Sequence, residues 1–292
     1  MKHGTILAGG GAGPWSIRFL LKTLRAAAPR SVRVALFSAV LILGTVSGDV
    51  PVCASPASEQ QDQTSRVREI LETIDRMWRG RSSEGEMEME VATSHWSRTL
   101  RMDAYTEGME RSLVRITYPA KEEGVATLKV GNDLWNYLPK INRVTRVPAS
   151  MMLGSWMGSH FTNDDLVKES RYADDYETTI TFEGDRDGQK ILELTLEPKP
   201  EAPVVWGKIV AAVRADDYIP LQMDYFNESG KEVRTLTFSK VQDMGGRRIP
   251  TELVMRPVDK PNESTRVTYL NLTFDVRLDP ELFSLRALQK RP

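Results

Sequence analysis

The spacing of apolar residues changes once along the chain, from a helical period to the period of a β-strand. Between Thr64 and Gly80, apolar residues recur every three to four positions, and charged residues occupy the opposite face. We predict one amphipathic helix here, ended by Gly80, that buries its apolar stripe against the rest of the fold. The stripe consists of Val67, Ile70, Leu71, Ile74, Met77 and Trp78. Residues 55–63, just before it, are polar and are predicted to form a flexible leader.

After Gly85, apolar and polar residues alternate, as in a strand with one buried face; residues 86–91 (EMEMEV) show this most clearly. Further strand candidates are residues 96–106, 110–118, 124–130, 133–138, 142–147, 174–183, 189–197, 205–214, 218–227, 231–241, 248–257 and 264–276. Turn pairs such as Asp187-Gly188 separate several of them, and there is no βαβ rhythm. We predict a mainly β (α+β) fold with an antiparallel, meander-like sheet of about 11–12 strands, which must curl towards a barrel or split.

One segment, residues 148–172, follows neither period and is called the lid segment below. Its sequence, PASMMLGSWMGSHFTNDDLVKESRY, crowds apolar side chains and glycines together. We interpret it as a movable apolar flap over a cavity rather than as core. The candidate lid residues are Met151, Met152, Trp156, Met157 and Phe161. Short helices are predicted to begin at Asn163 and at Asp279-Pro280.

The first 54 residues differ from the rest and are predicted to be a cleavable signal peptide that exports the protein to the periplasm. Residues 1–33 carry six basic side chains and no acid. Residues 34–46 are a weakly polar to apolar run of 13, short of the ~20 that a membrane-spanning helix needs. The preferred cleavage site follows Val52-Cys53-Ala54, and cleavage after Gly48 is the second choice. The alternatives are lipidation at Cys53, an uncleaved membrane anchor, and a start codon further downstream.

The near-neutral charge of the 292-residue chain is the sum of two unlike parts. The whole chain has 39 Lys+Arg and 40 Asp+Glu, but 33 basic and 39 acidic residues remain without residues 1–54, a net charge of −6. An acidic domain argues against a nucleic-acid binder that neutralises phosphates. Residues 55–292 contain no cysteine, so the exported domain depends on no disulfide.

The sequence contains no familiar catalytic or metal-binding pattern. GxSxG, Walker, GxGxxG, HExxH and EF-hand motifs are absent. Only His95 and His160 follow the signal peptide, and neither has a cysteine partner for a metal site. His160 lies near Asp164 and Asp165 in the sequence, which would allow a proton relay, but we prefer the interpretation as a polar residue in a loop. We predict a protein that is not an enzyme and that needs no metal or cofactor.

Methionine is the unusual component of the exported part, which holds 11 of the 12 methionines. Methionine fills irregular space and suits varied apolar ligands, although ordinary core packing explains the strand methionines equally well. The candidate cavity-wall residues are Met87, Met89, Trp96, Leu100, Met102 and Trp135.

Several stretches resemble the outer-membrane lipoprotein-sorting protein family, the LolA-like group. The resemblance runs from about Met77 to Leu288, so residues 64–292 are identified as one domain of this kind. The stretches are residues 133–139 (DLWNYLP), 143–146 (RVTR), 151–152 (MM), 155–159 (SWMGS), 161–166 (FTNDDL), 198–200 (PKP), 204–208 (VVWGK), 218–221 (YIPL), 234–239 (RTLTFS) and 244–250 (MGGRRIP).

This resemblance implies a half-open antiparallel β-barrel around a helix, with a hydrophobic cavity and a lid. It implies a monomeric periplasmic carrier, acting like a chaperone, that binds lipid or the acyl chains of lipoproteins and moves them between envelope membranes. The implied partners are an inner-membrane transporter and an outer-membrane acceptor. The family's carriers have an arginine that closes the cavity, and Arg143 and Arg146 are the candidates for it. The alternative is a sensor or adaptor of an envelope transporter or stress system that uses the fold without transport.

Overall fold

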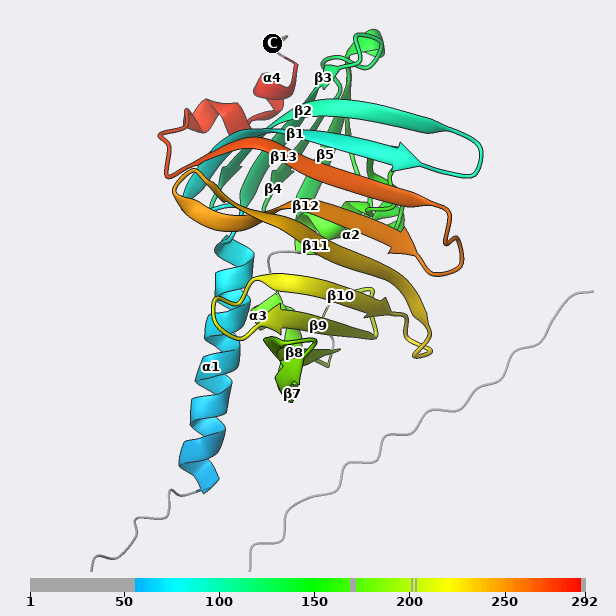
Figure 1. Cartoon of the computed structure of the whole chain (residues 1–292). Coiled ribbons are helices and arrows are strands. Elements are labelled where there is room, and N and C mark those ends of the chain that lie inside the picture. Colours follow the sequence, from blue (N-terminus) through cyan, green and yellow to red (C-terminus); the bar gives the residue numbers. More distant parts are fainter. Residues whose placement is uncertain (1–55, 169–171, 201, 203, 290–292) are drawn as a thin grey trace, which may run out of the picture. The chain divides into compact units, whose positions relative to one another are not determined.

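The computed structural model describes residues 56–168, 172–200, 202 and 204–289. All of them lie in the second of two compact units, Cys53–Pro292, so the predicted signal peptide falls outside the described residues. In this unit the helix α1 (Pro56–Arg76) is followed by a long series of strands (Figure 1). None of the described helices has the length and apolar content that crossing a membrane would require.

The described residues form one antiparallel sheet of 13 strands, in the order β6-β5-β4-β3-β2-β1-β13-β12-β11-β10-β9-β8-β7. The strands are β1 (Ser82–Ala92), β2 (Ser97–Glu107), β3 (Arg111–Tyr118), β4 (Ala126–Val130), β5 (Asp133–Leu138), β6 (Arg143–Arg146), β7 (Tyr176–Arg186), β8 (Gln189–Pro198), β9 (Lys208–Arg214), β10 (Pro220–Phe226), β11 (Glu232–Met244), β12 (Arg247–Pro257) and β13 (Ser264–Phe274). The edge strands β6 and β7 do not pair with each other, so the sheet curls without closing. The predicted half-open antiparallel barrel is therefore confirmed.

The sheet has 13 strands, slightly more than the predicted 11–12, and each of them overlaps one of the candidate segments named above, including the four-residue edge strand β6 at residues 142–147. Short helical elements interrupt or follow the strands. They are η1 (Pro139–Ile141), η2 (Ala149–Met151), η3 (Trp156–Gly158), α2 (Asn163–Lys168), α3 (Tyr172–Asp175), η4 (Pro280–Phe283) and α4 (Leu285–Leu288). The predicted helix starts at Asn163 and after Asp279 are confirmed.

The helix α1 buries the predicted stripe, with Ile70, Leu71 and Ile74 packed in the main hydrophobic core. It begins at Pro56, so residues 56–63 are helical rather than a flexible leader. They contain no glycine, and a proline is tolerated in the first turn, so nothing stops the helix from extending outwards. The helix ends at Arg76, and Gly80 adopts a positive φ of 60° in the turn that leads into β1.

The sheet is covered on both faces near β3, because the C-terminal elements pack on its outer face. Val114 and Ile116 on the inner face of β3 join the main core, whereas Leu113, Leu128 and Tyr137 on the outer face of β3–β5 pack with Phe283 and Leu288. Arg115 of β3 is buried and donates hydrogen bonds to the carbonyls of the last α4 residues, at 2.9 and 3.2 Å. Burial lowers the pKa of Arg115, and these carbonyls partly compensate the charge.

Two leucines on α4 test whether this outer cover stabilises the domain. Leu288 is fully buried and Leu285 is 46% exposed. Leu288→Ala should lower the free energy of unfolding by about 2–5 kcal/mol, because it leaves a cavity under the helix. Leu285→Ala, the matched control, should change it by less than about 0.5 kcal/mol. Urea denaturation followed by circular dichroism measures both, and equal effects would contradict a packed C-terminal cover.

Candidate functional site

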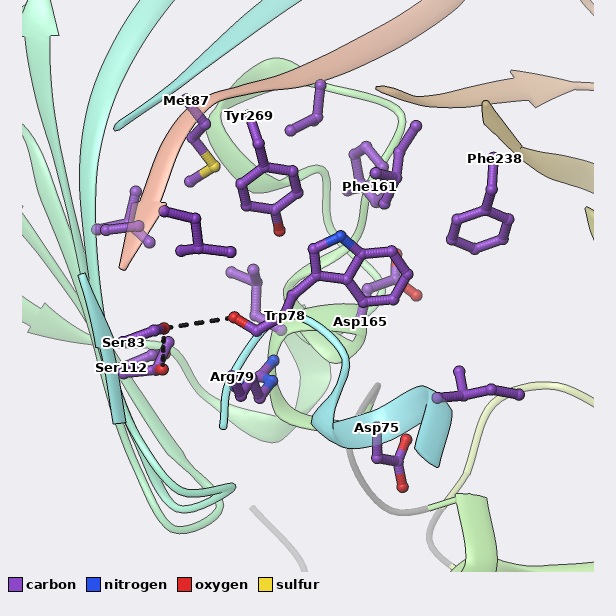
Figure 2. A pocket seen from close by; sticks show the side chains of 18 of the residues that line it. Asp75, Trp78, Arg79, Ser83, Met87, Ser112, Phe161, Asp165, Phe238 and Tyr269 are labelled. Atoms are coloured by element: carbon purple, nitrogen blue, oxygen red, sulfur yellow. Dashed lines mark hydrogen bonds between the residues drawn. The ribbon is translucent and has the colours of Figure 1, made fainter. Parts of the chain in front are cut away.

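The inner face of the sheet and the end of α1 enclose a cavity of about 150 Å³ (Figure 2). Most of its wall is apolar and comes from strands on both sides of the β1–β13 junction. The wall includes Met87, Val114, Phe238, Leu253, Val267 and Tyr269. An engineered apolar cavity of about 150 Å³ holds one benzene molecule, so this space takes a short acyl segment and not a whole lipid.

The cavity exists because one inward-facing position carries a small side chain. Side chains alternate along each strand, so Leu100, Met102 and Ala104 of β2 all point to the inner face. Leu100 and Met102 fill the core, whereas Ala104 lines the cavity opposite Val114, its partner on β3. The register thus places the cavity beside the second half of β2.

One end of the cavity is polar. Ser83 of β1, Thr106 of β2 and Ser112 of β3 line it together with Asp75 and Arg79 from the end of α1. The hydroxyls of Ser83 and Thr106 are 2.6 Å apart, and Ser83 also donates to the backbone carbonyl of Trp78. Figure 2 shows Ser83, Ser112 and Arg79 on one side of the space and Met87, Tyr269, Phe161 and Phe238 on the other.

The lid segment lies against the cavity and inserts a tryptophan into the interior; its residues 148–168 and 172 are described. Trp156 is 4% exposed, lines the cavity, and donates a hydrogen bond from Nε1 to Thr127 Oγ1 at 3.1 Å. Its backbone N–H is bonded to the carbonyl of Phe161, which closes a tight loop. Met157 inside that loop has φ of 49°, a left-handed conformation that is strained for a methionine.

A buried ion pair fastens the lid segment to the sheet, and we call it the latch. Arg234 of β11 bonds Asp165 of α2 through both of its terminal nitrogens, with Nη1 2.8 Å from Oδ2. The two side chains are only 6% and 11% exposed. Burial lowers the pKa of Arg234, but the charge of Asp165 and its hydrogen bond, with smaller effects of Tyr225 and Tyr172, together outweigh it, and the net shift is upward. The guanidinium also lies over the rings of Trp206 and Tyr225, at 4.1 and 4.4 Å.

A second anchor joins the lid segment to the start of β13. His160 Nδ1 lies 2.8 Å from Thr265 Oγ1, and Nε2 lies 3.2 Å from the carboxylate of Glu263. Glu263 also accepts hydrogen bonds from the backbone and hydroxyl of Ser94, and Lys260 lies 3.7 Å away. The hydrogen bond from His160, followed by the backbone N–H of Ser94, lowers the pKa of Glu263 to about 2.

A third anchor comes from the β1–β2 side of the sheet. Arg98 of β2 donates to the backbone carbonyl of Met157 and pairs with Glu122 at 3.0 Å. Three polar contacts from separate strands and turns thus hold one apolar segment over the cavity.

The candidate wall residues occupy three different environments. Met87 lines the cavity, whereas Met89, Leu100 and Met102 are packed in the main core. Trp96 is 45% exposed in the β1–β2 turn, and Trp135 packs on the outer cluster beneath the C-terminal elements. Strand alternation identifies the inner face but not the depth along it, because the curvature of the sheet decides where space remains.

The candidate lid residues are also divided. Trp156 and Phe161 line the cavity. Met157 packs against the main core, Met152 is half-buried, and Met151 is 58% exposed.

The candidate closing arginines, Arg143 and Arg146, lie on the edge strand β6 and are exposed, and Arg146 pairs with Asp133. The buried arginine at the lid is Arg234, which the sequence reasoning missed. A recognisable feature marked it, because Arg234 shares the inward face of β11 with Leu236 and Phe238. The polar residues Asp75, Arg79, Ser83, Thr106 and Ser112 were also missed.

Among the described residues, no three His, Cys, Asp or Glu side chains are grouped so that they could hold a metal ion.

A protein-family model described as an uncharacterized protein matches residues 108–290. No curated protein matches the chain.

Several solved structures have the same fold, and this chain matches them over nearly their whole length. A domain named for outer membrane lipoprotein sorting, from Vibrio parahaemolyticus, is 22% identical, with a TM-score of 0.68 over 79% of this chain and 99% of its own. A DUF1329 family protein from Desulfovibrio piger is 24% identical, with a TM-score of 0.69 over 81% and 100%. A LolA superfamily protein from Nitrosomonas europaea is 22% identical, with a TM-score of 0.64 over 75% and 98%. The chain therefore has a LolA-like fold.

The latch can be tested by a thermodynamic cycle. Asp165→Asn leaves the Arg234 charge buried without its counter-ion and should lower the free energy of unfolding by about 3–5 kcal/mol. The double variant D165L/R234M removes both charges and should recover much of this loss. Asp216→Asn is the control, because Asp216 pairs with Arg214 but is 67% exposed, and it should cost less than about 1 kcal/mol. If the Asp165 and Asp216 variants lost equal stability in urea denaturation, the lid would not depend on the latch.

The second anchor predicts a dependence on pH. The pKa of Glu263 lies below its ordinary value of 4.5, so its contribution to stability is complete above pH 4.5 and is lost as the pH falls towards 2. The difference in unfolding free energy between the wild type and Glu263→Gln should therefore be largest near neutral pH and shrink below pH 4.5. Denaturation series from pH 7 to pH 2.5 measure this, with Glu228→Gln on an exposed turn as control. A difference that stays constant with pH would rule out the anchor.

Proposed function

We propose that this chain, which belongs to the uncharacterized family whose model matches residues 108–290, is a periplasmic carrier of lipid or of the acyl chains of lipoproteins. The observation that carries the proposal is the apolar cavity beneath a lid held by a few polar contacts. The LolA-like fold and the name of the Vibrio relative support the same function. The basic and apolar N-terminus supports export.

The chemistry of the wall suits an acyl chain. Each methylene of such a chain gains about 0.8 kcal/mol on leaving water, so a dry apolar space is what a soluble carrier has to provide. The flexible side chain of Met87 and the rings of Phe238 and Tyr269 form a wall that adapts to chains of different shape. A carrier needs no catalytic group, in keeping with a protein that is not an enzyme.

The lid fits a carrier because binding must be reversible. The space of about 150 Å³ is too small for a whole acyl chain, so loading requires the indole of Trp156 and the loop that bears it to move. Opening would break three sets of polar contacts, and water would then hydrate the separated polar groups. It would leave the packing of α1 against the sheet intact. Such a local transition is characteristic of lids that gate a site.

Filling the cavity should abolish loading. Ala104→Phe puts a ring into the space and should weaken binding of a fluorescent fatty acid by about tenfold or more, equivalent to excluding two methylenes. Thr99→Phe is the matched control, because residue 99 lies on the same strand but faces outwards. Unchanged binding in Ala104→Phe, with wild-type circular dichroism, would argue that this cavity is not the binding site.

Native mass spectrometry of protein purified gently from its own envelope should recover bound acyl ligands. Transfer between donor and acceptor vesicles then separates a carrier from a sensor or adaptor: a carrier increases the rate of transfer in proportion to its concentration. Protein that carries no acyl ligand and moves none between vesicles would overturn the proposal.

A further inference from the structure

We propose that the polar end of the cavity is a headgroup subsite, and that it selects a single-chain amphiphile whose head carries one negative charge, such as a free carboxylate. This inference deepens the proposed carrier function and rests on it. The juxtaposition behind it is an arginine and a serine hydroxyl facing the same space, whose remaining wall is mostly apolar apart from Asp165 beneath the lid segment (Figure 2).

Arg79 is the central residue of this subsite. It lines the cavity at the end of α1, and in the described part of the chain its Nη1 atom is buried without a hydrogen-bond partner. A guanidinium stays charged at every physiological pH, so a buried, unsatisfied N–H on it carries a substantial cost. A bound anion would satisfy this donor with a charge-assisted hydrogen bond.

Ser112 supplies a second donor at the same end. Its hydroxyl makes no hydrogen bond to any other described residue, although it lines the cavity. The neighbouring hydroxyls of Ser83 and Thr106 are already bonded to each other, and Ser83 also donates to Trp78. A head that accepts from Arg79 and Ser112 would therefore complete the polar groups at this end.

Asp75 limits the charge of the head. It lines the cavity and lies four residues before Arg79 in the sequence. Its carboxylate adds a negative charge to the same end, so a dianionic phosphate would be repelled more than a monoanionic carboxylate. The small volume argues for one chain, because two acyl chains would need far more space than the lid leaves.

The subsite implies a direction for the ligand. A carboxylate at Arg79 and Ser112 directs the chain past Met87 towards Phe238 and Phe161 of the lid segment (Figure 2). The chain then lies under the lid segment, and the head remains beside α1.

Three ligands with the same twelve-carbon chain test the subsite: dodecanoate, dodecan-1-ol and dodecyl phosphate. Each competes with an uncharged apolar fluorescent probe, N-phenyl-1-naphthylamine, bound to the full exported domain. The wild type should bind dodecanoate at least tenfold more tightly than dodecanol, and more tightly than dodecyl phosphate. Arg79→Met should reduce the preference for dodecanoate over dodecanol to less than twofold and leave dodecanol binding unchanged.

Two further variants keep the test decisive. Ser112→Ala should reduce the preference for dodecanoate several-fold without touching the helix. Arg76→Met is the matched control, because Arg76 is the last residue of α1, three positions before Arg79, pairs with Glu72 and does not line the cavity. Its preference should equal that of the wild type.

The outcomes separate this inference from the proposed function. Equal binding of dodecanoate and dodecanol by the wild type would overturn the headgroup subsite and leave the apolar carrier intact. Dodecyl phosphate bound as tightly as dodecanoate would overturn the restriction to one charge. Failure of the domain to bind the probe or any of the three ligands would overturn the carrier function itself, and the subsite with it.

Discussion

The pairing of β1 with β13 determines most of this structure. It joins the first strand of the chain to the last, with Met87 opposite Tyr269 and Met89 opposite Val267, and so unites two runs of consecutive strands in one sheet. Neither run could surround a helix alone, because each would present its apolar face to water on one side. Once joined, they curl round α1, and the cavity lies where side chains from both runs meet.

The barrel core and the lid segment are held in place by different forces. The helix and the strands are stabilised by the burial of apolar surface. The free energy of this burial is large in total and changes little with small displacements. The lid segment is held by charged and hydrogen-bonded groups, in which geometry is decisive: Arg234 on Asp165, His160 on Glu263, and Arg98 on the carbonyl of Met157. Contacts of this kind are lost abruptly when the partners separate, whereas the packed core is undisturbed. Under the proposed function, this division would let the lid segment move while the barrel stays folded.

The regular parts of the fold could be predicted because burial imposes a period on the sequence. The stripe of α1 and the inward positions Leu100 and Met102 follow directly from spacing. The period of apolar residues gives no information about segments whose conformation is not determined by burial. Residues 56–63 are helical although they have no apolar face from which a helix could be predicted. Trp96 fits the strand period, but it lies in a turn that leaves its side chain exposed.

The cavity could be predicted only in part, for a related reason. A cavity is a space that side chains leave unfilled, so no residue pattern marks it in the sequence. Ala104 is an ordinary small apolar residue in the sequence, and only the strand register shows that it lies beside Val114. Arg234 was accessible in principle, because a charge on the apolar face of a strand has to meet a partner. Its partner, Asp165, could not be identified, since about seventy residues separate them in the sequence.

For the carrier proposed above, the position of the Trp156 indole has a consequence for how tightly a cargo would be held. The ring and a cargo chain compete for one volume, so the measured affinity is the affinity of the opened barrel reduced by the fraction of molecules that are open. Substitutions at Arg234 or Glu263, which lie off the cavity wall, would then retune cargo retention by altering that fraction. In such a carrier, the rate of cargo release would change without any substitution in the residues that line the cavity.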